Sequence, residues 1–117
     1  MKLPNADRAI VDIRKLRDYC LNPNSPKGRG KARVFNAALG LRQVDASVLR
    51  DALLQAALHE DCVPGERDEY GQRYAVDFDL RTGIGTRQVR SGWIVKPNED
   101  FPRLTMCYVL KSLGKTR

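Results

Sequence analysis

Apolar residues in the first half of the chain recur at the three-to-four-residue spacing of an α-helix. From Ile13 this spacing predicts a first helix, with Asp12 as its N-cap and the turn at Pro23 as its end. A second helix is predicted over residues 31–39, and Gly40 suits the left-handed residue that often follows a helix. The first half of the chain is therefore predicted to be helical.

A third helix is predicted to start after Asp45 and to run to about His59. Its apolar positions form a broad stripe that belongs in a core. The residues of this stripe are Val48, Leu49, Ala52, Leu53, Ala56 and Ala57. The second helix is expected to bury Val34, Phe35, Ala38 and Leu39.

From Val63 onward the period changes to strict alternation, which is typical of strands buried on one side. Alternation predicts strands over residues 73–80 and 87–95, joined by a hairpin loop from Thr82 to Gly85. Pairing Arg81 with Thr86 sets a register in which the apolar residues of both strands share a face. In this register Phe78 faces Val89, Tyr74 faces Trp93, and Asp77 lies opposite Arg90.

A further strand is predicted over residues 104–110, with Leu104, Met106, Tyr108 and Leu110 on the apolar face. Helices followed by strands indicate an α+β fold. We expect three N-terminal helices packed on one face of a C-terminal antiparallel β-meander of three to four strands, all in a single domain of residues 1–117. The other sheet face stays partly open and is expected to carry Arg73, Ala75, Asp77, Asp79, Gln88, Arg90, Arg103, Thr105 and Cys107.

The charge of the chain is concentrated in its first half. The 117 residues carry a formal net charge of +7, and residues 1–50 hold 11 Lys or Arg but only 4 Asp or Glu. Between Asp18 and Asp45 there is no acidic residue. Such a distribution favours polyanionic partners, nucleic acid first, through counterion release. The alternative is a basic protein whose charge only keeps it soluble.

The most basic segment is Lys27 to Arg33, with the sequence Lys-Gly-Arg-Gly-Lys-Ala-Arg. Ala32 stands where a P-loop needs Ser or Thr, and no predicted strand precedes the segment, so nucleotide hydrolysis is not indicated. A cationic loop that leads into a helix N-terminus suits a phosphate group. The alternative is a solvated loop without a ligand.

Other kinds of site have little support in the sequence. Cys20, Cys62 and Cys107 are far apart and odd in number, so neither a zinc site nor a disulfide framework is indicated. His59 is the only histidine and lies away from the basic half, and the acids of the predicted sheet lack further metal-ligand partners nearby in sequence. We expect no cofactor and no metal. Without a membrane-span pattern or signal-peptide core a cytoplasmic location is expected, with delivery inside a larger secreted toxin as the alternative.

Three groups of residues extend over nearly the whole chain. They are Leu3-Pro4-Asn5-Ala6 with Lys15, Leu16 and Tyr19; Asn22-Pro23 with Pro26, Gly28, Lys31-Ala32 and Phe35; and Tyr70-Gly71-Gln72-Arg73-Tyr74 with Trp93-Ile94-Val95 and Pro102-Arg103-Leu104. In order and spacing they resemble a small bacterial domain family of unknown function. The chain departs from the family pattern at Ser25, where histidine is frequent, and at Met106, where threonine is more usual. The layout of the family is similar to that of the barnase, EndoU, colicin and RelE ribonuclease toxins, which is an analogy of fold.

These observations lead to two hypotheses. The first is a toxin-like, metal-independent endoribonuclease that acts on tRNA or mRNA, in which cations stabilise the phosphorane. It assigns catalytic roles to Lys31, Arg90, Arg103 and Tyr70, and binding of the RNA backbone to Lys27, Arg29, Arg33 and Arg73. The second is a non-catalytic module that binds nucleic acid or an acidic partner, such as an antitoxin or immunity protein. The sequence does not identify a general base or an oligomeric state.

Overall fold

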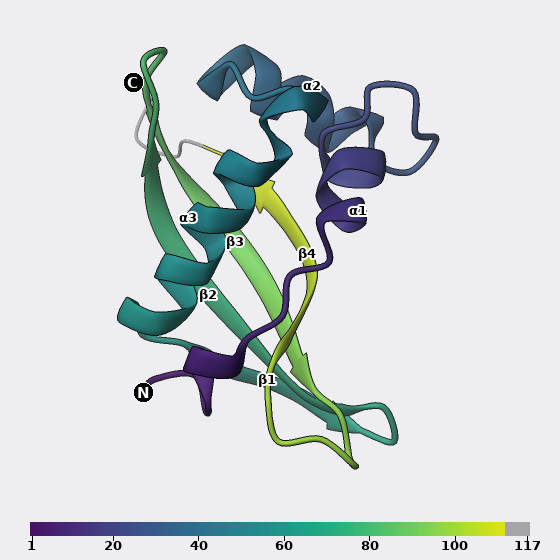
Figure 1. Ribbon diagram of the computed structural model, residues 1–117, viewed down its shortest axis with the longest axis vertical. Helices are drawn as coiled ribbons and strands as arrows, with labels where there is room; N and C mark the ends of the chain where they lie inside the picture. Colours follow the sequence, from purple (N-terminus) through teal and green to yellow (C-terminus); the bar gives the residue numbers. More distant parts are fainter. Residues whose placement is uncertain (112–117) are drawn as a thin grey trace.

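The predicted helices lie along one face of an antiparallel sheet, as the computed structural model of the protein shows for residues 1–111 (Figure 1). The helical layer contains α1 (Ile13–Lys15), α2 (Arg29–Leu39) and α3 (Ala46–His59). A π-helical turn, Leu16–Cys20, continues α1, and 3₁₀ turns lie at Ala6–Arg8 and Gln43–Asp45. The sheet consists of β1 (Val63–Asp68), β2 (Gly71–Arg81), β3 (Thr86–Val95) and β4 (Arg103–Val109).

Local chemistry determines where the helices begin and end. The carboxylate of Asp12 accepts a hydrogen bond of 3.0 Å from the backbone N–H of Arg14, so Asp12 is the N-cap that the sequence predicts. Gly40 adopts a left-handed conformation, with φ of 69°, directly after α2. Its N–H donates to the carbonyl of Asn36 at 2.8 Å. Both predicted helix boundaries are therefore confirmed, although α2 begins two residues earlier than predicted.

The four strands pair in sequence order, β1-β2-β3-β4, which is the predicted meander. Between β2 and β3 every predicted partner is observed: Arg81 with Thr86, Phe78 with Val89, Asp77 with Arg90, and Tyr74 with Trp93. The added strand, β1, has all six residues exposed and pairs with the first part of β2 only, through an irregular register. It gave no alternating signal because neither of its faces is buried.

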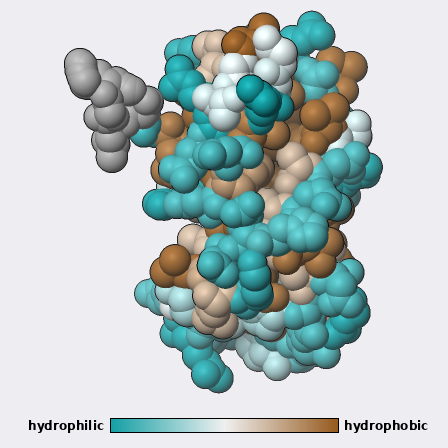
Figure 2. Space-filling view, turned by 90° about the vertical axis from the view of Figure 1, so that its left-hand side faces the viewer, coloured by the Kyte–Doolittle hydropathy of each residue, from teal (hydrophilic) through white to brown (hydrophobic). Residues whose placement is uncertain are grey.

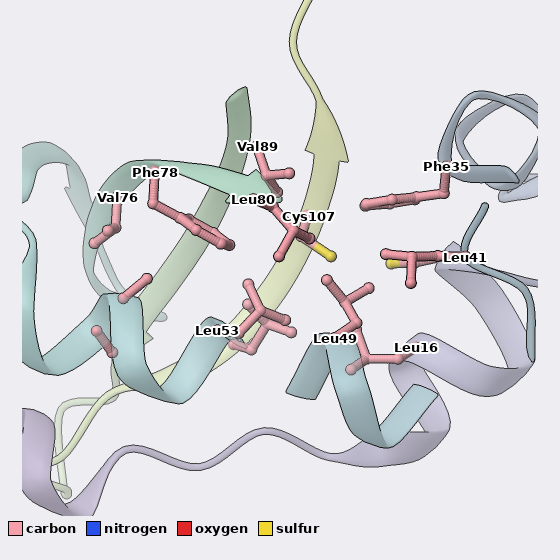
Figure 3. Packing of buried hydrophobic residues seen from close by; sticks show 14 of the residues in the cluster. Leu16, Phe35, Leu41, Leu49, Leu53, Val76, Phe78, Leu80, Val89 and Cys107 are labelled. Carbon is pink, nitrogen blue, oxygen red and sulfur yellow. The ribbon is translucent and has the colours of Figure 1, made fainter. Parts of the chain in front are cut away.

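The core lies between the sheet and the helical layer, and Figure 3 shows its packing. Trp93 is fully buried, and its indole N–H donates to the Ser91 hydroxyl at 2.9 Å. That hydroxyl donates in turn to the carbonyl of Val76 at 2.8 Å, so the buried polar groups are satisfied. Two expected core residues, Val34 and Val48, are instead exposed, because Phe35 and Leu49 already fill the space between the layers.

The predicted faces of β4 are wrong beyond Leu104. The register between β3 and β4 shifts at Gly92 and Trp93, where Gly92 pairs with Met106 but Trp93 pairs with Leu104. One extra residue in β4 at this point is a β-bulge, and it reverses the alternation of all following residues. Cys107, which we expected on the open face, is fully buried, and Figure 3 shows it among core side chains. Tyr108 and Met106 lie on the open face instead.

The surface of the molecule is predominantly hydrophilic on the side that Figure 2 presents, where hydrophobic residues form separate patches. Within residues 1–111, none of the helices combines the length and the apolar character that crossing a bilayer requires.

Candidate functional site

Arg90 is held on the open face of the sheet by an acid from the neighbouring strand. Its Nε and Nη2 atoms donate to the two carboxylate oxygens of Asp77, both at 2.8 Å. This two-point contact fixes the plane of the guanidinium group. Asp77 raises the pKa of Arg90 above its ordinary value, and the hydroxyl of Tyr108 acts in the same direction. Arg90 is therefore a permanently charged group in a defined orientation.

Lys31 lies in the helical layer near Tyr108, which is the β4 partner of Arg90. The first turn of α2 passes along β4, and there the Lys31 ammonium lies 5.8 Å from the ring centroid of Tyr19 and 6.0 Å from that of Tyr108. Attraction between the cation and the two aromatic faces favours this position. No carboxylate lies within ion-pair distance of Lys31 among residues 1–111, so its charge remains available to a ligand.

Tyr108 joins these two cations into one cluster. It pairs with Arg90 across the β3–β4 ladder and carries the ring beneath Lys31. A small pocket of about 220 Å³ opens here, lined by Gly30, Lys31, Val34, Tyr108 and Val109. We call Lys31, Tyr108, Arg90 and Asp77 the edge cluster. The sequence prediction named Lys31 and Arg90 but missed Tyr108, because strict alternation assigned this tyrosine to the core.

The other predicted sheet residues lie toward the opposite end of the open face. Arg103 pairs with Ile94, four residues along β3 from Arg90, which corresponds to a separation of about 13 Å. Its Nε donates to Glu99 at 2.8 Å. Arg73, on the other side of Ile94, is bound to Asp68 at 2.7 Å. The structure therefore places Arg73 and Arg103 in one row across the sheet, apart from the edge cluster.

Tyr70 occupies the turn between β1 and β2, beyond the Arg73 row. It is exposed, and its backbone N–H donates to Asp68 at 2.9 Å. Tyr70 is therefore farther from the edge cluster than Arg73 and Arg103 are. Of the four residues predicted to be catalytic, the fold brings together only Lys31 and Arg90.

The basic segment is largely helical rather than a loop. Arg29 begins α2, so Arg29, Lys31 and Arg33 project from its first turns, and only Lys27 and Gly28 precede it. Gly28 is required by close packing: a Cβ at this position would lie 2.0 Å from the carbonyl oxygen of Tyr19. The Ser25 hydroxyl accepts from the Gly28 N–H at 3.2 Å and reinforces this turn. The expectation of a cationic loop is therefore wrong from Arg29 onward, and Gly28 is a packed residue of the turn before α2.

The cations on and next to α2 form no ion pair with an acid in the part of the chain that the structure describes. None of the ion pairs among residues 1–111 involves Lys27, Arg29, Arg33 or Arg42. We call these four residues together with Lys31 the α2 cations. Over the same residues no group of three or more His, Cys, Asp or Glu side chains is arranged to hold a metal ion.

The fold is similar to that of a solved chain from a "Contact-dependent growth inhibition toxin - immunity protein complex from Klebsiella pneumoniae 342", with a TM-score of 0.67 and 16% sequence identity. The alignment covers 86% of this chain and 99% of that one. At this identity the similarity is one of fold. No curated protein matches the sequence.

The sequence itself matches one family over almost its whole length. The match extends over residues 2–111 and includes every element described above. This agrees with the resemblance to a domain family without an assigned function. The chain belongs to the family described as "Domain of unknown function (DUF6883)".

Proposed function

We propose that this domain is a toxin-like endoribonuclease that cleaves tRNA or mRNA without a metal ion, with the edge cluster at the scissile phosphate. The observation that carries the proposal is the meeting of Lys31, Tyr108 and Arg90 at the junction of α2 and β4. Two cations of fixed position beside a phenol suit a phosphate whose charge increases during reaction. The shared fold with a chain from a toxin–immunity complex supports a role in such a system.

In the proposed reaction the ribose 2′-OH attacks the adjacent phosphorus, and its proton passes to water. Arg90 and Lys31 stabilise the extra negative charge of the phosphorane. The P–O5′ bond then breaks, and the Tyr108 hydroxyl donates a proton to the leaving 5′-oxygen. The Tyr108 phenolate regains a proton from water, which balances the proton released in the first step. The products are a 2′,3′-cyclic phosphate and a 5′-hydroxyl.

The remaining predicted site residues divide into two supporting groups under this proposal. Lys27, Arg29 and Arg33 contact the RNA backbone along α2. Arg73, Arg103 and Tyr70 contact the part of the RNA that passes over the far end of the open face. The charge on the α2 cations supplies affinity that does not depend on sequence.

Incubation of the purified protein with total RNA in EDTA tests this function. We expect fragments that end in 2′,3′-cyclic phosphate. Arg90→Ala should slow cleavage by a factor on the order of 10²–10³, as for loss of one preorganised donor at a developing oxyanion. Lys31→Ala and Tyr108→Phe should also slow it. RNA that remains intact with wild-type protein would contradict the proposal.

Arg87→Ala is the matched control for Arg90→Ala. Arg87 lies on the same strand, is exposed, and occupies the opposite alternation from Arg90. Arg87→Ala removes one positive charge, as Arg90→Ala does, but leaves the edge cluster unchanged, so cleavage should continue at the wild-type rate. Equal losses in the two variants would show that only net charge matters.

A non-catalytic role is the second candidate, and the ion pairs of the sheet favour it. Arg73, Arg90 and Arg103 each bind a carboxylate at 2.7–2.8 Å, whereas the α2 cations have none within residues 1–111. Such a division suits a module that binds RNA or an acidic antitoxin or immunity protein through α2 alone. Binding of RNA without cleavage would support this second function.

A further inference from the structure

A second pocket lies on the flank of α2 that faces away from Tyr108. It has a volume of about 400 Å³ and is formed by α2, the end of the π-helical turn, and the 3₁₀ turn before α3. This volume lies within the range of about 300–1,000 Å³ typical of small-molecule sites. Nothing in the proposed cleavage chemistry uses this pocket.

The polar side of the pocket is cationic. Arg33 and Arg42 line it from two different segments, and neither forms an ion pair with any acid in residues 1–111. Two guanidinium groups at one concave site provide the planar, multiply donating geometry that binds phosphate oxygens. The pocket is therefore suited to an anion.

The other side of the pocket is apolar. Pro23 and Val44 line it and are exposed, whereas Leu21 and Leu41 beneath them belong to the buried core. An inorganic anion gains nothing from such a surface, whereas a flat ring loses water on contact with it. Asn36 adds an amide from α2, which can donate to and accept from a base edge. Phosphate-binding and base-contacting groups are thus present in one pocket.

We propose that this pocket binds one ribonucleotide of an RNA strand, with its phosphate on Arg33 and Arg42 and its base against Pro23 and Val44. This rests on the proposed function for the source of the nucleotide. An α-helix is about 10–12 Å thick, so the bound nucleotide is separate from the one cleaved at the edge cluster. The pocket selects an unpaired, extruded base, because single-stranded RNA is read by its splayed bases.

Titration of ¹⁵N-labelled protein with the 5′-monophosphates of the four nucleosides tests binding directly. We expect shifts of the side-chain amide signals of Asn36 and Gln43, which both line the pocket. The double variant Arg33→Ala/Arg42→Ala should weaken binding at least tenfold. The control Arg81→Ala/Arg87→Ala removes the same charge from exposed hairpin positions and should bind as the wild type does. Inorganic phosphate should bind more weakly than any nucleotide.

Absence of shifts at these amides would overturn the inference, as would equal affinity for phosphate and nucleotides. Kinetics then identify the source of the nucleotide. With RNA as substrate, Asn36→Ala, which leaves the charge of the protein unchanged, should raise KM and leave kcat unchanged. Nucleotide binding with an unchanged KM would overturn the assignment to RNA. Nucleotide binding by a wild-type protein that cleaves no RNA would refute the proposed function alone, and normal cleavage without nucleotide binding would refute this inference alone.

Discussion

The open face of the sheet and the surface around α2 hold their cations in different ways. On the sheet, Arg73, Arg90 and Arg103 are each bound to a carboxylate on the same or the next strand or loop. On and around α2 the cations project without acidic partners among residues 1–111. A paired arginine has a fixed orientation but little net charge, whereas an unpaired one offers its whole charge to a ligand. The sheet is therefore suited to positioning, and α2 to attraction.

The largest expected effect comes from truncating Trp93, because both the helical layer and the sheet pack on this residue. Trp93 is fully buried between the layers, so Trp93→Ala should lower the free energy of unfolding by about 3–5 kcal/mol. Urea denaturation measures this loss, and wild-type tryptophan emission should show a buried indole. A loss below about 1 kcal/mol would mean that the helical layer and the sheet do not depend on a common core.

The contrast in charge is tested most directly by salt dependence. Changing Lys27, Arg29, Lys31 and Arg33 together to Ala should lower the slope of log K for RNA against log salt by roughly 3, at about 0.7–0.9 per lost contact. The matched control removes the three ion pairs of the sheet as whole pairs, with both partners changed to Ala: Arg73 with Asp68, Arg90 with Asp77, and Arg103 with Glu99. We expect a change in slope below about 1, because each pair carries no net charge. Equal changes per residue would abolish the distinction between the two surfaces.

Two glycines at the start of α2 show how firmly the basic surface is held. Gly28→Ala should destabilise the protein by about 1–3 kcal/mol, because the new Cβ meets the Tyr19 carbonyl. Gly30→Ala is the control: nothing lies within 4 Å of its Cβ, and a helical alanine should add about 0.5–1 kcal/mol. Thermal or urea unfolding distinguishes the two, and similar values would refute the close packing at Gly28.

The smallest expected effect is on folding at the sheet ion pair. Arg90 and Asp77 are partly exposed, so their coupling should contribute about 0.2–1 kcal/mol to stability. A double-mutant cycle of Arg90→Ala and Asp77→Ala measures this value. A coupling of several kcal/mol would identify the pair as structural and weaken its assignment to the edge cluster.

The sequence predicted the fold where one face of an element is buried. Alternation alone gave the complete β2–β3 register and the burial of Trp93, because a slip by one residue would expose every apolar side chain of the hairpin. It gave no signal for β1, whose residues are all exposed. Asp12 and Gly40 were predictable because caps have strong local preferences.

The candidate site was less accessible to sequence reasoning. Lys31 and Arg90 could be named from charge and register, but Tyr108 could not, because a bulge has no pattern of its own in a single sequence. The α2 pocket was also missed. Arg33 and Arg42 share it because α2 and the following turn fold back on each other, and that contact is tertiary. Gly92, an isolated glycine inside a predicted strand, was the one sign in the sequence of the bulge between β3 and β4.

In β4, the alternation of the sequence and the packing against the helices favour opposite faces for the same residues. The alternation of residues 104–110 predicts a regular strand with Met106 and Tyr108 facing the core. The helical layer instead accepts Cys107 and Val109, which pack with the core. Local preference and tertiary environment therefore disagree, and one inserted position, Thr105, decides between them. Deletion of Thr105 would give a regular strand that keeps the observed faces, because each later residue would retain its partner on β3. Pairing of Thr105 with Gly92 without the bulge would instead put Cys107 in the place of Tyr108 at the protein surface. The chemistry available at this edge is thus encoded in the number of residues as much as in their identity.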